Sequence, residues 1–525
     1  MLYLLPQAID RAVERFPERE AVCFPPHSLH YTDLVRQANG LARLLIAEGV
    51  RRGDRVGIYM DKSLESVVAL YGIMKAGAAY VPLDPFAPLA RLTYVIRDCG
   101  IRHLITKKEK LPRLRQITAE TTSLRCLIGL EPVADLSLCC IGWDEIHALS
   151  SDAPPDVNVI EQDLAYILYT SGSTGVPKGI MHTHRSGLNF ALWAVQTYDL
   201  RAEDRLSNHA PLHFDLSTFD FFAGALAGAA TVIISETVSR FPASVSELMA
   251  DERLTVWYSV PFALAQLLLY GVLEERDLTR LRWVLFAGEP FPVKHLQALL
   301  AKLAHVRFSN LYGPTETNVC TYYHVPQVLA EPGEPLPIGK ACANTEVLVV
   351  DDDDRPVADG EIGELLVRGP IVMGGYWGRP DLNQKAFFRH SLYPHRENLF
   401  YRTGDLVQLK SDGTYKFLGR KDRQVKVRGY RIELDEVESA LLLHEQVQEA
   451  AVYSVPHELI NMRLEAVVVP KRGTQVASPI LVKHLSQLLP KYAIPDRIMI
   501  TDALPRTSTG KVDWQALKAL SGDES

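Results

Sequence analysis

Short apolar runs alternate with longer segments of helical character through most of the chain. Residues 55–59, Arg-Val-Gly-Ile-Tyr, are followed by a helix-like segment over 63–74 and by a second apolar run over 79–82. Such alternation is typical of βαβ units, in which neighbouring strands lie parallel. The pattern therefore predicts an α/β fold, with mostly parallel, layered sheets in a large N-terminal domain.

The pattern changes after Asp405, where short strand-like runs flank a charged segment over 419–428. We expect a small α+β C-terminal domain there, with residues 1–421 forming the large domain and residues 422–525 the small one. The elements expected after Asp405 are strands over 406–409, 414–418, 449–454 and 463–470, and helices over 434–443 and 479–488.

The composition is that of a soluble globular protein. The 525 residues exceed the size of one ordinary core, and 47% of them are hydrophobic while 23% are charged. A net charge of −7 without a basic block argues against nucleic-acid binding. Seven cysteines, an odd number without a Cys-x-x-Cys pair, suit a reducing cytosol better than a disulfide framework. We therefore expect a cytoplasmic protein.

The apolar segments do not predict membrane insertion. Met1–Leu5 is too short for the core of a signal peptide. The longest apolar stretch, residues 256–273, is interrupted by Ser259 and Pro261 among others. It predicts a buried strand, a turn and a helix rather than a membrane span.

The segment Tyr169–Gly179 carries the strongest chemical signal. It reads Tyr-Thr-Ser-Gly-Ser-Thr-Gly-Val-Pro-Lys-Gly and follows an apolar run, Leu164–Leu168, that predicts a buried strand. Glycines let a backbone approach a ligand closely, while hydroxyls, N–H groups and an ammonium suit a polyphosphate. The spacing differs from that of a P-loop, and Pro177 disfavours a helix running through the lysine. Alone, the segment could equally be a surface loop.

Six further motifs accompany this segment in a fixed order. They are Leu29–Leu34, Met74–Pro85, Asn310–Thr317, Tyr401–Leu406, Gly419–Glu433 and Pro505–Lys511. Together they resemble the core motifs of amino-acid adenylation domains of nonribosomal peptide synthetases, which share a superfamily with acyl-CoA synthetases and firefly luciferase. The resemblance extends from about residue 10 to about residue 515. It implies an ATP-dependent ligase that forms an acyl-adenylate and releases pyrophosphate.

That reaction brings two anions together, the substrate carboxylate and the α-phosphate. The site must therefore offer fixed positive charge, Mg²⁺ and oriented N–H donors. The resemblance implies that Lys511 bridges the carboxylate and the phosphate oxygens, that Glu316 holds Mg²⁺ and that Thr315 contacts phosphate. One glutamate suffices, because Mg²⁺ commonly takes one or two protein carboxylates plus phosphate oxygens.

The resemblance also assigns the ATP site. Tyr312 would stack against adenine, Asp405 would accept from the ribose hydroxyls, and Arg420 would lie near ribose and phosphates. The full set implied for ATP is Thr170, Ser171, Gly172, Ser173, Thr174, Gly175, Lys178, Ala287, Gly288, Glu289, Leu311, Tyr312, Gly313, Asp405, Phe417 and Arg420.

Asp215, in His213–Ser217, matches the position where amino-acid-activating members face the substrate ammonium; the simpler interpretation is an aspartate that caps the following helix. An ammonium partner would offset the cost of burying that carboxylate. The substrate set implied is Phe214, Asp215, Leu216, Phe219, Ser259, Leu285, Ala287, Leu311, Val319, Cys320 and Lys511. This small apolar lining is similar to that of L-prolyl-AMP ligases and favours L-proline. Valine, isoleucine or another small aliphatic amino acid is the alternative, because apolar pockets discriminate one methylene by only ~1–3 kcal/mol.

For the second half-reaction, the resemblance implies that the small domain swivels about Asp422. The swivel would move Lys511 away and bring Arg428–Gly429 to the site, where a thiol attacks. Only fourteen residues follow Lys511, without a carrier or condensation motif, so we expect the acceptor to be the phosphopantetheine thiol of a separate carrier protein. The rival hypotheses are an acyl- or aryl-CoA ligase, an inactive adenylate-binding protein and an oxygenase of the luciferase kind.

Overall fold

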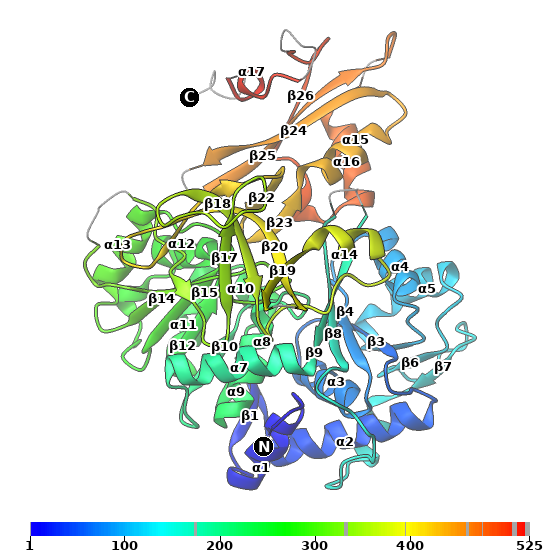
Figure 1. Cartoon of the computed structure of the whole chain (residues 1–525). Coiled ribbons are helices and arrows are strands. Elements are labelled where there is room, and N and C mark those ends of the chain that lie inside the picture. Colours follow the sequence, from blue (N-terminus) through cyan, green and yellow to red (C-terminus); the bar gives the residue numbers. More distant parts are fainter. Residues whose placement is uncertain are drawn as a thin grey trace.

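The computed structural model consists of a large part and a smaller C-terminal part that lies across one end of it (Figure 1). The structure describes residues 2–172, 176–329, 334–393, 395–457, 461–474, 476–506 and 512–519. None of the described helices has the length and apolar character needed to cross a bilayer.

Two mostly parallel sheets form the large part. The first has the strand order β16-β15-β14-β13-β12-β10-β11-β1-β2 and the second the order β7-β6-β5-β3-β4-β8-β9. The strands of the first sheet are β1 (Glu20–Phe24), β2 (His27–His30), β10 (Arg205–Asn208), β11 (Ala230–Ile233), β12 (Val256–Ser259), β13 (Trp283–Ala287), β14 (Arg307–Tyr312), β15 (Thr321–Val325) and β16 (Lys340–Ala341). Those of the second are β3 (Arg55–Tyr59), β4 (Ala79–Pro82), β5 (His103–Thr106), β6 (Cys126–Ile128), β7 (Cys139–Ile141), β8 (Leu164–Thr170) and β9 (Lys178–Thr183).

Helices cover and separate these sheets. Those of the large part are α1 (Gln7–Arg15), α2 (Tyr31–Ala47), α3 (Leu64–Lys75), α4 (Leu89–Asp98), α5 (Leu111–Glu120), α6 (Trp143–Ala148), α7 (His184–Tyr198), α8 (Leu216–Thr218), α9 (Gly224–Ala227), α10 (Glu236–Ser239), α11 (Pro242–Asp251), α12 (Pro261–Tyr270), α13 (Val293–Lys302) and α14 (Pro380–Ala386). Helix α3 contacts β1 of one sheet and β3 and β4 of the other, so it lies between the sheets and is buried on nearly all sides. Its first turn is fixed by a capping box between Ser63 and Ser66.

A third, antiparallel sheet completes the large part. It contains β17 (Glu346–Val350), β18 (Ile362–Arg368), β19 (Phe387–Tyr393), β20 (Arg396–Leu409) and β21 (Tyr415–Arg420). The separate short strand expected over 406–409 is instead the end of the long strand β20. Both β18 and β19 pair along β20, and this tertiary pairing keeps polar residues such as Arg402 and Thr403 extended.

The C-terminal part begins with a hairpin of β22 (Gln424–Val427) and β23 (Tyr430–Glu433). It continues with α15 (Leu434–Leu442), β24 (Val447–His457), β25 (Asn461–Pro470), α16 (Ser478–Leu488), β26 (Arg497–Ile500) and α17 (Trp514–Ala519). The helices and strands expected from the sequence in this region are therefore confirmed, with ends shifted by a few residues. A separate apolar cluster, including Val437, Leu441, Leu464 and Leu485, gives this part its own core.

Candidate active site

The candidate site lies where the carboxyl ends of parallel strands face the C-terminal hairpin. Strands β10, β12, β13 and β14 run parallel, so the segments that follow them meet at one edge of the first sheet. Ligand sites of parallel α/β sheets form at this edge. The segments holding Asp215, Glu289 and Glu316 follow β10, β13 and β14, and the sheet thereby brings together motifs that are far apart in sequence.

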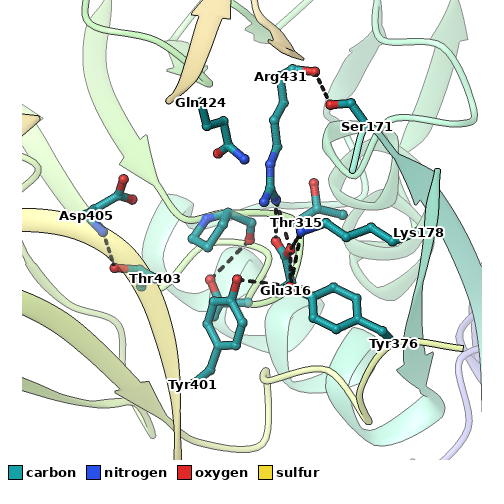
Figure 2. A network of polar contacts seen from close by, with 12 residues as sticks. Ser171, Lys178, Thr315, Glu316, Tyr376, Tyr401, Thr403, Asp405, Gln424 and Arg431 are labelled. Carbon is teal, nitrogen blue, oxygen red and sulfur yellow. Dashed lines mark hydrogen bonds and ion pairs between the residues drawn. The ribbon is translucent and has the colours of Figure 1, made fainter. Parts of the chain in front are cut away.

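Glu316 is the centre of a polar network (Figure 2). It is fully buried; the Tyr376 hydroxyl donates to its Oε1 at 2.8 Å, and Lys178 Nζ lies 3.5 Å from the same oxygen. Arg431 Nη1 of the hairpin donates to both carboxylate oxygens, at 2.9 and 2.7 Å. Burial raises the pKa of Glu316, but Arg431 and Lys178 together hold it well below its usual range. Glu316 is therefore a carboxylate at any working pH.

The hydroxyl-rich segment predicted to hold phosphates joins β8 to β9. Thr170 and Lys178 are paired across these strands, so both ends of the segment lie close together. The Thr170 hydroxyl is buried and has no hydrogen-bond partner among the described residues. Burial and the charge of Arg431 lower the pKa of Lys178 to about 8. Three members of the predicted set, Ser173, Thr174 and Gly175, lie outside the described residues.

The predicted ribose residues meet because of strand register. Asp405 on β20 is the Cα partner of Arg420 on β21, and the Arg420 guanidinium donates to its carboxylate. The Tyr312 hydroxyl donates to the other carboxylate oxygen, and the Tyr312 and Phe417 rings are 6.4 Å apart. Arg420 also forms a two-point ion pair with Asp422, at 2.6 and 2.7 Å. The structure thus assembles four of the residues predicted to bind the nucleoside and ties them to the predicted hinge.

Asp215 lies at the start of α8 and is partly buried. Burial raises its pKa, against the opposing effects of a hydrogen bond with the Thr315 side chain and the charge of Lys426. Asp215 occupies the N-cap position of α8, but its side chain makes no capping hydrogen bond to the second or third residue of the helix. A carboxylate in this position is electrostatically suited to a cationic ligand.

Most of the predicted substrate lining belongs to one apolar cluster. This cluster is the main core of the large part and extends from Leu5 to Val407. The predicted lining residues within it are Leu216, Phe219, Leu285, Ala287, Leu311, Val319 and Cys320, with Phe214 packed against it. Phe219 makes an edge contact with Tyr258, with the ring centres 5.1 Å apart. Ser259 shares a face of β12 with Trp257, opposite to the face of Tyr258. Its hydroxyl accepts from Trp257 Nε1 at 2.8 Å. The only predicted hydroxyl of the pocket is therefore already engaged by the protein.

A cavity of about 810 Å³ lies beside this cluster, between the two parts of the chain. Residues of its wall include Phe214, Leu216 and Ser259 from the large part and Arg428, Tyr430 and Tyr492 from the C-terminal part. The Tyr430 ring stacks on Tyr492 at 3.8 Å and meets Phe214 edge-on at 5.0 Å. The cavity therefore reaches the residues on either side of Asp215.

The C-terminal hairpin itself occupies the site. Gly429 has a φ of +80° and approaches Val260 so closely that an added Cβ would lie 2.3 Å from a Val260 methyl carbon. The Arg428–Gly429 turn is thus docked against the large part, which is the orientation expected for transfer. Lys511 lies outside the described residues; on either side of it, Arg506 and Val512 are paired.

Four site residues were missed by sequence analysis: Tyr376, Lys426, Arg431 and Tyr401. Lys426 and Arg431 lie inside the recognised motif Gly419–Glu433, so their charge in that motif was the available signal. Tyr401 is the first residue of the recognised motif Tyr401–Leu406, and that motif was its signal. Tyr376 lies in none of the recognised motifs and reaches Glu316 because its segment pairs with Ile180 of β9.

Glu289 gives a pH-dependent prediction. Its Oε1 accepts from the Phe262 N–H at 3.1 Å, Oε2 has no partner among the described residues, and burial raises the pKa of Glu289 to about 7. Because this pKa is higher in the folded state, Glu289 makes the wild-type protein less stable as the pH rises from about 4.5 to 7. Glu289→Gln should raise the free energy of unfolding by on the order of 2–3 kcal/mol at pH 8 and by little at pH 5.

Urea unfolding at the two pH values measures this effect. Glu445→Gln, at an exposed position of the C-terminal part, is the control and should be neutral at both. An equal effect of Glu289→Gln at pH 5 and pH 8 would contradict the prediction.

The carboxylate of Glu316 is itself suited to Mg²⁺. It is buried and ionised, the kind of oxygen ligand that Mg²⁺ prefers, and phosphate oxygens would complete the shell. Elsewhere in the described part of the chain, Glu48, Cys126 and Cys139 form a second group of possible metal ligands at the amino ends of β6 and β7. That group takes no part in the site.

This fold, a large α/β part with a smaller C-terminal part over the strand ends, is that of adenylate-forming enzymes. The chain belongs to the family of AMP-binding enzymes: residues 9–377 match that family, and residues 436–511 match the AMP-binding enzyme C-terminal domain. The family and the fold class expected from the sequence motifs are confirmed.

Two relatives are similar along nearly their whole length. An L-proline–[L-prolyl-carrier protein] ligase of Pseudomonas fluorescens is 38% identical over 515 residues, covering 98% of each chain. A protein of the same name from Streptomyces coelicolor is 36% identical over 501 residues, covering 93% of this chain and 91% of its own.

Solved structures share the fold. The Vibrio cholerae adenylation domain AlmE, in complex with glycyl-adenosine-5'-phosphate, has a TM-score of 0.83 and 25% identity, covering 100% of this chain and 98% of its own. The amide bond synthetase McbA from Marinactinospora thermotolerans has a TM-score of 0.86 at 23% identity, covering 98% and 99%.

Proposed function

We propose that the protein activates L-proline with ATP, releasing pyrophosphate, and then transfers the prolyl group from AMP to the phosphopantetheine thiol of a separate carrier protein. The observation that carries the proposal is Asp215, a partly buried carboxylate whose neighbours Phe214 and Leu216 line the cavity wall. An α-ammonium would pair with it, and a pyrrolidine ring would fit the apolar walls. The full-length similarity to two L-prolyl-carrier protein ligases supports the same substrate.

The adenylation step follows from the charges of the site. Glu316 would hold Mg²⁺, which neutralises phosphate charge when bound. Lys178 and the hydroxyls of the β8–β9 segment would bind the departing pyrophosphate, Asp405 would accept from the ribose, and Lys511 would bridge the carboxylate and the α-phosphate. Fixed cations and donors aimed at developing charge stabilise such a transition state without reorganisation.

The transfer step would use the cavity between the two parts. Its apolar and aromatic walls extend to the residues beside Asp215, so a long thiol arm entering it would reach an adenylate held at the site. The two parts would change orientation at Asp422 between the half-reactions. Arg420 forms ion pairs with both Asp422 and Asp405, so a change of backbone conformation at Asp422 would be coupled to the ribose carboxylate.

ATP–pyrophosphate exchange across the twenty amino acids, benzoate, salicylate and octanoate tests the substrate. We expect exchange with L-proline well above all others, followed by loading of a phosphopantetheinylated carrier protein. Exchange with valine or isoleucine instead would keep the enzyme and refute proline. Exchange only with aryl or fatty acids would refute Asp215 as an ammonium partner, and transfer to coenzyme A in preference to a carrier would make the protein a CoA ligase.

A further inference from the structure

Arg431 is hydrogen-bonded to Glu316, the carboxylate that would hold Mg²⁺ in the adenylation step. One guanidinium nitrogen, Nη1, lies 2.9 Å from Oε1 and 2.7 Å from Oε2 of Glu316, whose side chain is 0% exposed (Figure 2). Mg²⁺ binds oxygen ligands at ~2.0–2.1 Å. A guanidinium in contact with both oxygens leaves no open side of the carboxylate for that ion. Arg431 and Mg²⁺ are therefore alternative occupants of Glu316.

The surrounding charges make this exclusion electrostatic as well as steric. Lys178 Nζ already lies 3.5 Å from Glu316 Oε1, so two cations share one carboxylate. A divalent ion added to this pair would be strongly repelled at these distances in a buried site. Conversely, once the metal has left, a buried carboxylate with too little compensating charge is costly. Arg431 supplies the missing charge at that stage.

A second contact of the same residue reaches the phosphate segment. The Ser171 hydroxyl donates to the backbone carbonyl of Arg431 at 2.8 Å. Arg431 therefore contacts the metal-binding carboxylate through its side chain and the phosphate segment through its backbone. Both contacts are made by the hairpin whose Arg428–Gly429 turn lies at the cavity.

We propose that Arg431 replaces Mg²⁺ on Glu316, so that the hairpin docks for thiol transfer only after magnesium pyrophosphate has left. Arg431 is a positioning residue in this scheme, and it imposes the order of the two half-reactions. The inference rests on the proposed function insofar as it needs an adenylation step followed by a transfer step.

The test measures binding of magnesium pyrophosphate to the full-length enzyme, without nucleotide or amino acid, by isothermal titration calorimetry. In Arg431→Ala the competing cation is absent, so the affinity should rise by about 5- to 150-fold, the usual range of coupling between competing states. Arg431→Lys should stay close to wild type, because it restores the charge. Arg472→Ala, an exposed cation of the same part, is the matched control and should not change the affinity. Unchanged affinity in a folded Arg431→Ala protein overturns the proposal.

Two further measurements separate the inference from the proposed function. Adding Glu316→Gln to Arg431→Ala should remove the gain in affinity, and a gain that persists shows that Glu316 is not the shared ligand. Single-turnover transfer from preformed aminoacyl-adenylate should slow in Arg431→Ala while pyrophosphate exchange is retained. If proline supports exchange but affinity does not rise, only the role of Arg431 fails. If the enzyme activates a carboxylic acid other than proline while Arg431→Ala binds magnesium pyrophosphate more tightly, only the substrate proposal fails.

Discussion

Replacing Lys511 by alanine should slow ATP–pyrophosphate exchange by about 10²–10³-fold, the usual cost of losing one transition-state donor. The lysine is the predicted bridge between two anions that repel each other, so its loss should reduce kcat more than it raises the KM for either substrate. Among the described residues of the C-terminal part, the contacts to Glu316 and Ser171 come from Arg431 of the hairpin rather than from the chain next to Lys511. The transfer step should therefore not need the lysine.

Transfer from chemically prepared prolyl-adenylate is the internal control for this variant. It should proceed within a few-fold of wild type in Lys511→Ala, because the adenylate is supplied ready-made. Lys518→Ala, which removes a neighbouring cation on α17, should leave both half-reactions unchanged. Loss of both half-reactions in a folded Lys511→Ala protein would show that the lysine is not specific to adenylation.

Removing the carboxylate of Asp215 should have the second large effect. Asp215→Ala should lower kcat/KM for the amino acid by about 10²–10³-fold, since leaving one member of a buried ion pair without its partner costs ~3–5 kcal/mol. The KM for ATP should change little, because the ribose and phosphate positions depend on other residues. Steady-state exchange with each substrate varied in turn measures both quantities.

A substrate without nitrogen makes this prediction sharper. Cyclopentanecarboxylate has the shape of proline without its ammonium, and wild type should discriminate against it strongly. In Asp215→Ala this discrimination should shrink or reverse, while Asp215→Asn, which keeps the shape and the hydrogen bond with the Thr315 side chain, should lie between the two. Undiminished preference for proline in Asp215→Ala would refute the aspartate as the ammonium partner.

The hydrophobic pattern predicted those helices and strands whose formation depends on residues close together in the sequence. The run over 55–82 gave β3, α3 and β4 because apolar strands and a capped helix are encoded within a few residues. Strand β20 was predicted too short because its first half is polar and is held extended only by β18 and β19. The motifs also identified the family, since glycine, hydroxyl and charged residues at fixed spacing are constraints of chemistry rather than of packing.

The sequence by itself determined the fold class, the family and the candidate residues of the site. Only the tertiary structure decided which of those residues meet: register places Arg420 opposite Asp405, and docking of the hairpin places Arg431 on Glu316. The physical reason is one of range. Propensity, capping and motif chemistry act within a few residues, whereas a buried ion pair between residues 115 positions apart forms only when two parts of the chain pack together.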